Sequence, residues 1–280
     1  MKVRLTPVQK IAYCGLLIVL NVLLTRIPGL AQVGPIFSFN RIGLGTAVTI
    51  FSSLLLGPFY GALVGVAGDA LGWVTMGQFT GVFNFFLSIY YAILGIVPWV
   101  FAWVLSLFKK RPIIEKSVLY ALFFALYALF VSLLWGANLF DESFNKWGME
   151  LLSTKITTTV LAFVLMALTF VGLFFCLRYF ERRSERLSGV PTPYRIGIIC
   201  FLTEVMVILL KPLAFVLYCL VLVGKPISEA WNITYEGLVL LNLLFGFADI
   251  PLNTLFVTLA CILSKRFVRS KLAAEDNKGE

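Results

Sequence analysis

Long apolar runs separated by short polar gaps make up this chain, and that alternation constrains its fold more than any other feature. About 20 apolar residues are enough to cross the ~30 Å hydrocarbon layer of a bilayer as a helix. Every polar gap is shorter than about 25 residues, whereas a separate domain needs at least ~50. A soluble domain cannot bury 60% hydrophobic residues with only 13% charged ones and a mean hydropathy of +0.95. The sequence therefore predicts one all-α domain over residues 1–280, a polytopic transmembrane helical bundle in a lipid bilayer.

Eight of the apolar runs are expected to be helices. They fall near residues 8–27, 43–57, 58–75, 82–108, 116–137, 156–178, 196–223 and 237–264. The second and third runs are short for a membrane span, so we expect them to be packed inside the bundle. The first run follows basic residues, as in a signal peptide, but no small-x-small cleavage site comes after it. We therefore interpret it as a span.

The basic residues between the runs predict the orientation of the chain. Alternate gaps carry seventeen Lys and Arg residues, and the remaining gaps carry five. Because basic residues favour the cytoplasmic side of a membrane, both termini are expected to be cytoplasmic. The same rule accounts for the formal net charge of +9, so we expect no nucleic-acid partner.

Several kinds of chemistry are excluded by what the sequence lacks. Histidine is absent, and the five cysteines stand singly in apolar runs, so no metal site of the Cys/His type is expected. There is no GxxxxGK[ST] phosphate-binding loop, and a Ser/His/Asp triad is impossible. The sequence therefore favours a protein that is not an enzyme, holds no cofactor and does not itself hydrolyse ATP.

A stripe of glycines follows the Gly57-Pro58 dipeptide. It contains Gly61, Gly65, Gly68 and Gly72. Steps of three or four residues place small residues on one side of a helix, where neighbouring backbones can approach closely. The stripe predicts tight helix packing.

Four ionisable residues lie inside the apolar runs, where a charge is costly and is a candidate for function. They are Asp69, Glu204, Lys211 and Asp249. One interpretation is that they line a polar cavity open to the outside. The other is that Lys211 neutralises Glu204 or Asp249 and sets the helix register.

The first half of the chain resembles a known family. The pattern consists of Asn40-Arg41-Ile42, LLGPFYGALVG at 55–65, Asp69, Gly72, GQFTG at 77–81 and LGIVP at 94–98. Over residues 8–108 it resembles the substrate-binding S components of energy-coupling factor vitamin transporters, most closely the folate-type branch.

The resemblance implies a bacterial plasma-membrane protein of six helices that binds a vitamin, folate-like compounds being favoured, on the outer side. It also implies partners: a transmembrane coupling subunit and two ATPase subunits. The expected substrate-binding residues are Asn40, Arg41, Asp69, Trp73, Gln78, Phe79, Phe83, Asn84, Lys211, Asp249 and Asn253. The expected surface for docking on the coupling subunit is formed by Ala12, Gly15 and Val19, although Val19 is larger than the family pattern prefers.

Within that site, Arg41 is expected to pair with a substrate carboxylate, because a guanidinium can bind one bidentately. Trp73, Phe79 and Phe83 are expected to line the site beside a flat ring of the substrate. The side-chain amides of Gln78, Asn84 and Asn253 are expected to supply hydrogen bonds. Asp69 is expected either to accept a hydrogen bond from a donor on the substrate ring or to stabilise the fold.

Eight helices exceed the six that the resemblance implies, so one pair is additional. Residues 116–178 could be an insertion and 196–264 the native ending, or the later pair could be the addition. The rival function is a stand-alone, proton-coupled secondary transporter, in which the four intramembrane ionisable residues relay protons.

Overall fold

The computed structural model describes residues 5–26, 44–75, 83–108, 111–136, 151–184, 191–231 and 235–276. Within these ranges every element is a helix, as expected. The helices are α1 (Pro7–Arg26), α3 (Gly45–Leu56), α4 (Pro58–Thr75), α5 (Phe85–Ser106), α6 (Pro112–Gly136), α8 (Leu151–Ser184), α9 (Pro193–Tyr218), the π-helical segment η1 (Cys219–Val223), α10 (Ile227–Trp231) and α11 (Tyr235–Asp276). Each of the eight predicted apolar runs is helical over most of its described residues.

Six of these helices are long and apolar enough to cross a membrane, so the chain has the character of a multi-pass membrane protein. They are the segments Pro7–Thr25, Phe85–Ser106, Pro112–Trp135, Lys155–Arg182, Pro193–Val223 and Tyr235–Lys265. At 1.5 Å per residue, the 12-residue helix α3 is about 18 Å long. It is therefore too short to span the hydrocarbon layer alone.

The short helices α3 and α4 form an antiparallel hairpin about Gly57. This residue has φ +104°, a left-handed conformation that glycine adopts without the steric cost of a Cβ. Gly61 of α4 lies against Ser53 of α3, and Gly65 lies against Thr49. The two helices thus run alongside each other from the turn outwards.

Most of the glycine stripe serves helix packing, as the sequence predicts. A Cβ on Gly61 would lie 2.3 Å from the carbonyl oxygen of Gly95 in α5, and a Cβ on Gly65 would lie 2.5 Å from that of Tyr91. On the neighbouring face, a Cβ on Gly68 would lie 2.5 Å from the side chain of Asn21 in α1. Helix α4 therefore touches α5 backbone to backbone and α1 through one buried amide.

Asn21 joins the first three helices. Its side chain is 4% exposed, and its Nδ2 donates to Thr49 Oγ1 in α3 at 3.3 Å and to the carbonyl of Val64 in α4 at 3.2 Å. Two adjacent elements supply the acceptors that a buried amide requires. This residue lies inside an apolar run, and the sequence analysis did not identify it.

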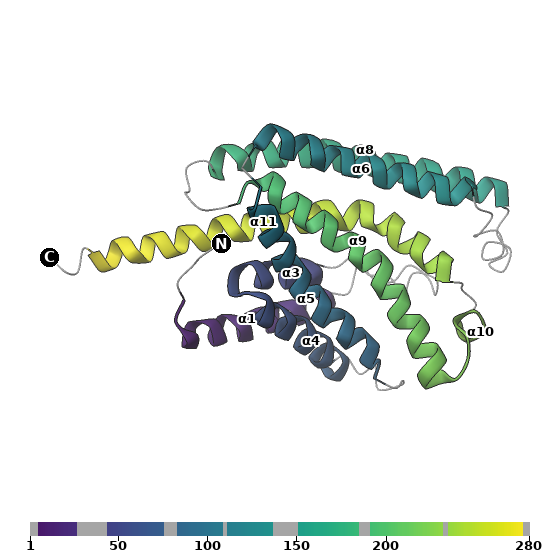
Figure 1. Cartoon of the computed structure of the whole chain (residues 1–280), viewed down its shortest axis with the longest axis horizontal. Helices are drawn as coiled ribbons and strands as arrows, with labels where there is room; N and C mark the ends of the chain where they lie inside the picture. Colours follow the sequence, from purple (N-terminus) through teal and green to yellow (C-terminus); the bar gives the residue numbers. More distant parts are fainter. Residues whose placement is uncertain are drawn as a thin grey trace.

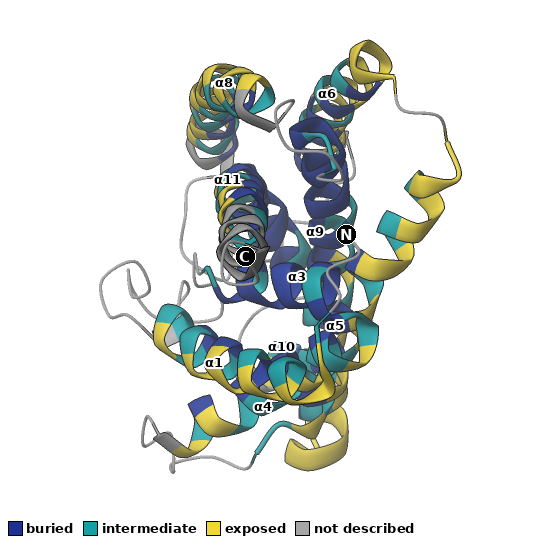
Figure 2. Cartoon of the chain, turned by 90° about the vertical axis from the view of Figure 1, so that its left-hand side faces the viewer, coloured by how far each residue is buried: buried dark blue, intermediate teal, exposed yellow. Residues whose placement is uncertain are grey.

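The helices form three layers, which both views of the chain show (Figures 1 and 2). The first layer contains α1, α3, α4 and α5, the middle layer contains α9 and α11, and the last contains α6 and α8. Helix α9 packs on α5 and α11 packs on α3, while α6 and α8 pack on each other and on the middle layer. Buried residues accordingly concentrate in α3, α9 and α11 (Figure 2).

The middle layer faces two apolar cores. Toward α1, α3 and α4, α9 presents Ile196, Ile199 and Cys200. Toward α6 and α8, it presents Ile198 and Phe201. Both faces of α9 are therefore covered by protein along its first turns, whereas α6 and α8 keep one side exposed.

Candidate functional site

A polar cluster lies between α9 and α11 in the middle layer. It contains Glu204, Lys211, Asp249 and Asn253, which we call the α9–α11 polar cluster. Asn253 Nδ2 donates to Glu204 Oε2 at 3.3 Å, and both side chains are almost fully buried, 1% and 3% exposed. Glu204 interacts electrostatically with Asp249 and Lys211, and Asp249 interacts with Lys211. Two acids and one base from two helices are thus gathered at the α9–α11 contact, with Glu204 buried and Lys211 and Asp249 half-buried.

Helical periodicity explains why these residues meet. Glu204 and Lys211 are seven residues apart, about two turns, so they share a face of α9. Asp249 and Asn253 are four residues apart and share a face of α11 in the same way. The sequence analysis anticipated the face of α9, but pairing it with α11 required the packing of the two helices.

Helix α5 contributes a tyrosine side chain next to this cluster. Tyr90 is 4% exposed and interacts electrostatically with Glu204 and Asp249. Its ring centroid lies 4.9 Å from that of Tyr91. The polar cluster therefore borders three helices, two from the middle layer and one from the first layer.

Asp69 has a defined role in holding α4 on α5. Ser88 Oγ donates to Asp69 Oδ2 at 2.8 Å. The contact continues the register in which Gly61 faces Gly95 and Gly65 faces Tyr91. This hydrogen bond is a structural role for Asp69, and its expected role in substrate binding stays a prediction. Ser88 itself was not identified from the sequence.

At the adjoining ends of α4 and α5, two aromatic residues named from the sequence come together. The ring centroids of Trp73 and Phe83 are 5.4 Å apart, with their planes at 69°. Next to them, Asn84 caps α5, its Oδ1 accepting from the backbone N–H of Leu87 at 3.3 Å. This contact assigns Asn84 a role in starting the helix.

Four of the expected site residues lie outside the described residues: Asn40, Arg41, Gln78 and Phe79. The remaining ones form two groups. One group is Asp69, Trp73, Phe83 and Asn84 along the α4–α5 contact, and the other is Lys211, Asp249 and Asn253 between α9 and α11. Helix α5 packs against both α4 and α9 and so lies between the two groups.

The residues expected to dock on a partner subunit lie on the open side of α1. Ala12, Gly15 and Val19 are exposed, and a Cβ on Gly15 would meet nothing within 4 Å. Their neighbours Ile11 and Leu16 are also exposed, at 65% and 64%. This side of α1 is apolar and is not covered by the described part of the chain.

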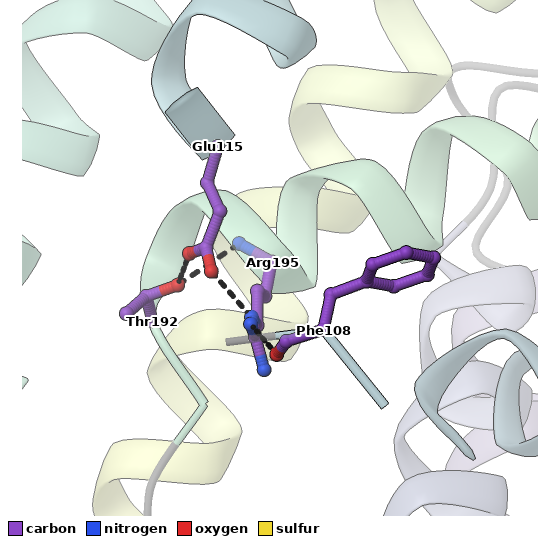
Figure 3. A network of polar contacts seen from close by, with 4 residues as sticks. All are labelled: Phe108, Glu115, Thr192 and Arg195. Atoms are coloured by element: carbon purple, nitrogen blue, oxygen red, sulfur yellow. Dashed lines mark hydrogen bonds and ion pairs between the residues drawn. The ribbon is translucent and has the colours of Figure 1, made fainter. Parts of the chain in front are cut away.

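A second buried polar network joins the ends of three helices (Figure 3). Arg195 Nε at the start of α9 lies 2.5 Å from Glu115 Oε1 in the first turn of α6, and its Nη2 donates to the carbonyl of Phe108 after α5 at 2.8 Å. Thr192 Oγ1 donates to Glu115 and accepts from the backbone N–H of Arg195, capping α9. The entry to α6 is thereby fastened to the end of α5 and the start of α9.

Within the residues that the structure describes, no three His, Cys, Asp or Glu side chains are grouped as a metal site requires. The fold and the polar clusters together define a polytopic helical membrane protein with ionisable groups inside its bundle. No family model, no curated protein and no solved structure matches this chain.

Proposed function

We propose that the chain is a membrane-embedded binding subunit for uptake of a small polar solute. Its energy comes from ATP hydrolysis on separate partner subunits. The observation that carries the proposal is the α9–α11 polar cluster, because ionisable residues inside a membrane bundle mark substrate or ion sites. Folate-like vitamins are the favoured ligands, on the strength of the sequence resemblance in residues 8–108.

The packing of the helices supports this proposal. Two layers in direct contact contain six helices: α1, α3, α4 and α5 in the first, and α9 and α11 in the middle one. The hairpin of α6 and α8 packs on the face of the middle layer that is turned away from the first layer. This arrangement favours residues 116–178 as the additional pair. The six remaining helices then correspond in number to the resembled family.

The chemistry of the two residue groups suits a flat, acidic ligand. Lys211 offers a cation to a ligand carboxylate, and Asn253 offers an amide. Trp73 and Phe83 offer aromatic faces that can stack on a ring. In the proposed complex, Arg41 completes the site from the extracellular side, as the sequence resemblance implies. The apolar side of α1 with Ala12, Gly15 and Val19 docks on the transmembrane coupling subunit.

The test is to purify the full chain in neutral detergent and to identify co-purifying small molecules by mass spectrometry. Folic acid binding is then measured by isothermal titration calorimetry. Arg41→Ala, and Lys211→Gln in protein that thermal unfolding shows to be folded, are expected to weaken binding at least tenfold, the effect of losing a charged contact. Lys225→Gln, an exposed lysine beyond η1, is the matched control and is expected to bind like the parent. Unchanged binding in the Lys211 and Arg41 variants contradicts the site, and absence of any bound vitamin contradicts the ligand class.

One observation favours a second candidate, a proton-coupled secondary transporter. Glu204 and Asp249 interact with each other and with Lys211 inside the bundle, as proton-relay groups do. That candidate predicts solute accumulation by the protein alone in proteoliposomes, abolished by an uncoupler. The binding subunit predicts binding without accumulation until a coupling subunit and ATPases are supplied.

A further inference from the structure

The hairpin of α6 and α8 brings basic residues together at one end. Lys116 Nζ lies 5.0 Å from the ring centroid of Phe174, and the rings of Tyr120 and Phe170 are 4.7 Å apart. As the residue number rises along α6 it falls along α8, so the helices are antiparallel. Arg178, one turn beyond Phe174, therefore lies at the end of the hairpin where α6 begins.

This end of the hairpin carries more positive charge than its own acids can balance. The described basic residues are Arg111, Lys116, Arg178, Arg182 and Arg195, and the described acids are Glu115 and Glu181. Arg195 is paired with Glu115. That pair leaves four basic residues against the one remaining carboxylate, Glu181, which accepts a hydrogen bond from Tyr194. The neighbouring sequence adds Lys109, Lys110, Arg183 and Arg186 against Glu185.

Exposed apolar side chains adjoin the charge. Ile113 is 80% exposed and Ile114 is 49% exposed in the first turn of α6, and on α8 Phe175 is 64% and Tyr179 57% exposed. Arg178 lies between Phe175 and Tyr179 in the sequence of α8, and Arg182 follows about one turn later. Both arginines are exposed. Charge next to exposed apolar surface at the end of a membrane-spanning helix matches the boundary between lipid headgroups and acyl chains.

We propose that this end of the α6–α8 hairpin binds an anionic phospholipid. The phosphate contacts Arg178 and Arg182, whose guanidinium groups suit phosphate geometry. The acyl chains lie along the exposed apolar side chains of α6 and α8. This lipid site does not depend on the proposed function, because it lies on α6 and α8 in the last layer, whereas the α9–α11 polar cluster lies in the middle layer.

The test measures thermal unfolding of the full chain in neutral detergent while phosphatidylglycerol or phosphatidylcholine is titrated. Phosphatidylglycerol is expected to raise the unfolding temperature with saturation, and phosphatidylcholine is not. At about fivefold in affinity for each basic residue near a membrane surface, R178Q/R182Q is expected to raise the half-saturating phosphatidylglycerol concentration roughly 30-fold. Native mass spectrometry should show the same loss of retained anionic lipid.

Three controls separate this proposal from its alternatives. K225Q removes an exposed charge between η1 and α10 and is expected to leave the titration unchanged. Helix α10 lies far from the start of α6 (Figure 1). R178K/R182K keeps the charge that orients the chain and is expected to shift the midpoint less than about fivefold. In 1 M salt, where the screening length is about 3 Å, the parent chain is expected to lose most of its response.

Equal stabilisation by phosphatidylcholine, or by inorganic phosphate at the same concentration, would overturn the lipid assignment. So would a salt-independent response of the parent chain. That last measurement needs no variant, so it decides the question even if R178Q/R182Q does not fold.

Discussion

Gly61 of α4 and Gly95 of α5 meet backbone to backbone, since a Cβ on Gly61 would lie 2.3 Å from the Gly95 carbonyl oxygen. The reverse substitution is equally obstructed, because a Cβ on Gly95 would lie 2.3 Å from the backbone of Gly61 and Ala62. The two helices therefore cannot keep this separation with any side chain at either position.

Gly61→Ala is expected to lower the free energy of unfolding by about 1–3 kcal/mol, because the added methyl must push α5 away from α4. Reversible unfolding in mixed detergent micelles measures the change. Gly15→Ala is the matched control, since its Cβ meets nothing within 4 Å. There the better helix propensity of alanine is expected to leave stability unchanged or slightly raised. Equal losses at both positions would contradict the close packing of α4 on α5.

Asp69 and Ser88 are expected to stabilise the same contact. Ser88→Ala removes the donor to Asp69 and is expected to cost about 1 kcal/mol, the size of typical side-chain hydrogen bonds between membrane helices. Asp69→Ala is expected to cost at least as much, and the double variant less than the sum of the two. Asp69→Asn keeps an acceptor and is expected to retain most of the stability. Strictly additive losses in the double-mutant cycle would show that the two residues do not interact.

Lys211 is expected to be required for stability because it offsets two carboxylates, buried Glu204 and half-buried Asp249. Lys211→Met leaves Glu204 and Asp249 without that cation in the interior and is expected to cost about 3–5 kcal/mol. Adding Asp249→Asn to this variant is expected to restore part of the loss, since one of the two acids is then neutral. Thermal unfolding in detergent measures both changes. A single variant as stable as the parent would show that the cation is not needed to balance the cluster.

The ion pair between Glu115 and Arg195 is expected to fasten the α6–α8 hairpin. Glu115→Ala leaves the Arg195 guanidinium, with a side chain 10% exposed, without its carboxylate and is expected to cost about 3–5 kcal/mol. Replacing both residues by apolar ones, Glu115→Leu with Arg195→Met, is expected to recover most of the loss. Protease protection of the α6–α8 hairpin provides a local readout beside global unfolding. Equal instability of the single and double variants would argue against a direct pair.

Much of the fold was predictable from the sequence because helix formation and membrane insertion depend on local composition. In the described part of the chain, the apolar runs predicted the helices α1, α3, α4, α5, α6, α8, α9 and α11 to within a few residues at most ends, although α8 and α11 extend well past their runs. The spacing of Gly61 and Gly65 predicted a packing face, because small residues three or four apart align on any helix. The candidate site was predictable in part: Glu204 and Lys211 were expected on one face of a helix.

The identity of each partner required the tertiary structure. Nothing near Asp69 in the sequence indicates Ser88, and nothing near Asn21 indicates Thr49. Eighty residues separate Glu115 from Arg195, and forty-nine separate Glu204 from Asn253. Sequence periodicity places a residue on a face of its own helix but carries no information about which helix lies opposite or in what register. Those choices are made by the packing of whole helices, which here places α9 and α11 between two layers and the α6–α8 hairpin outside.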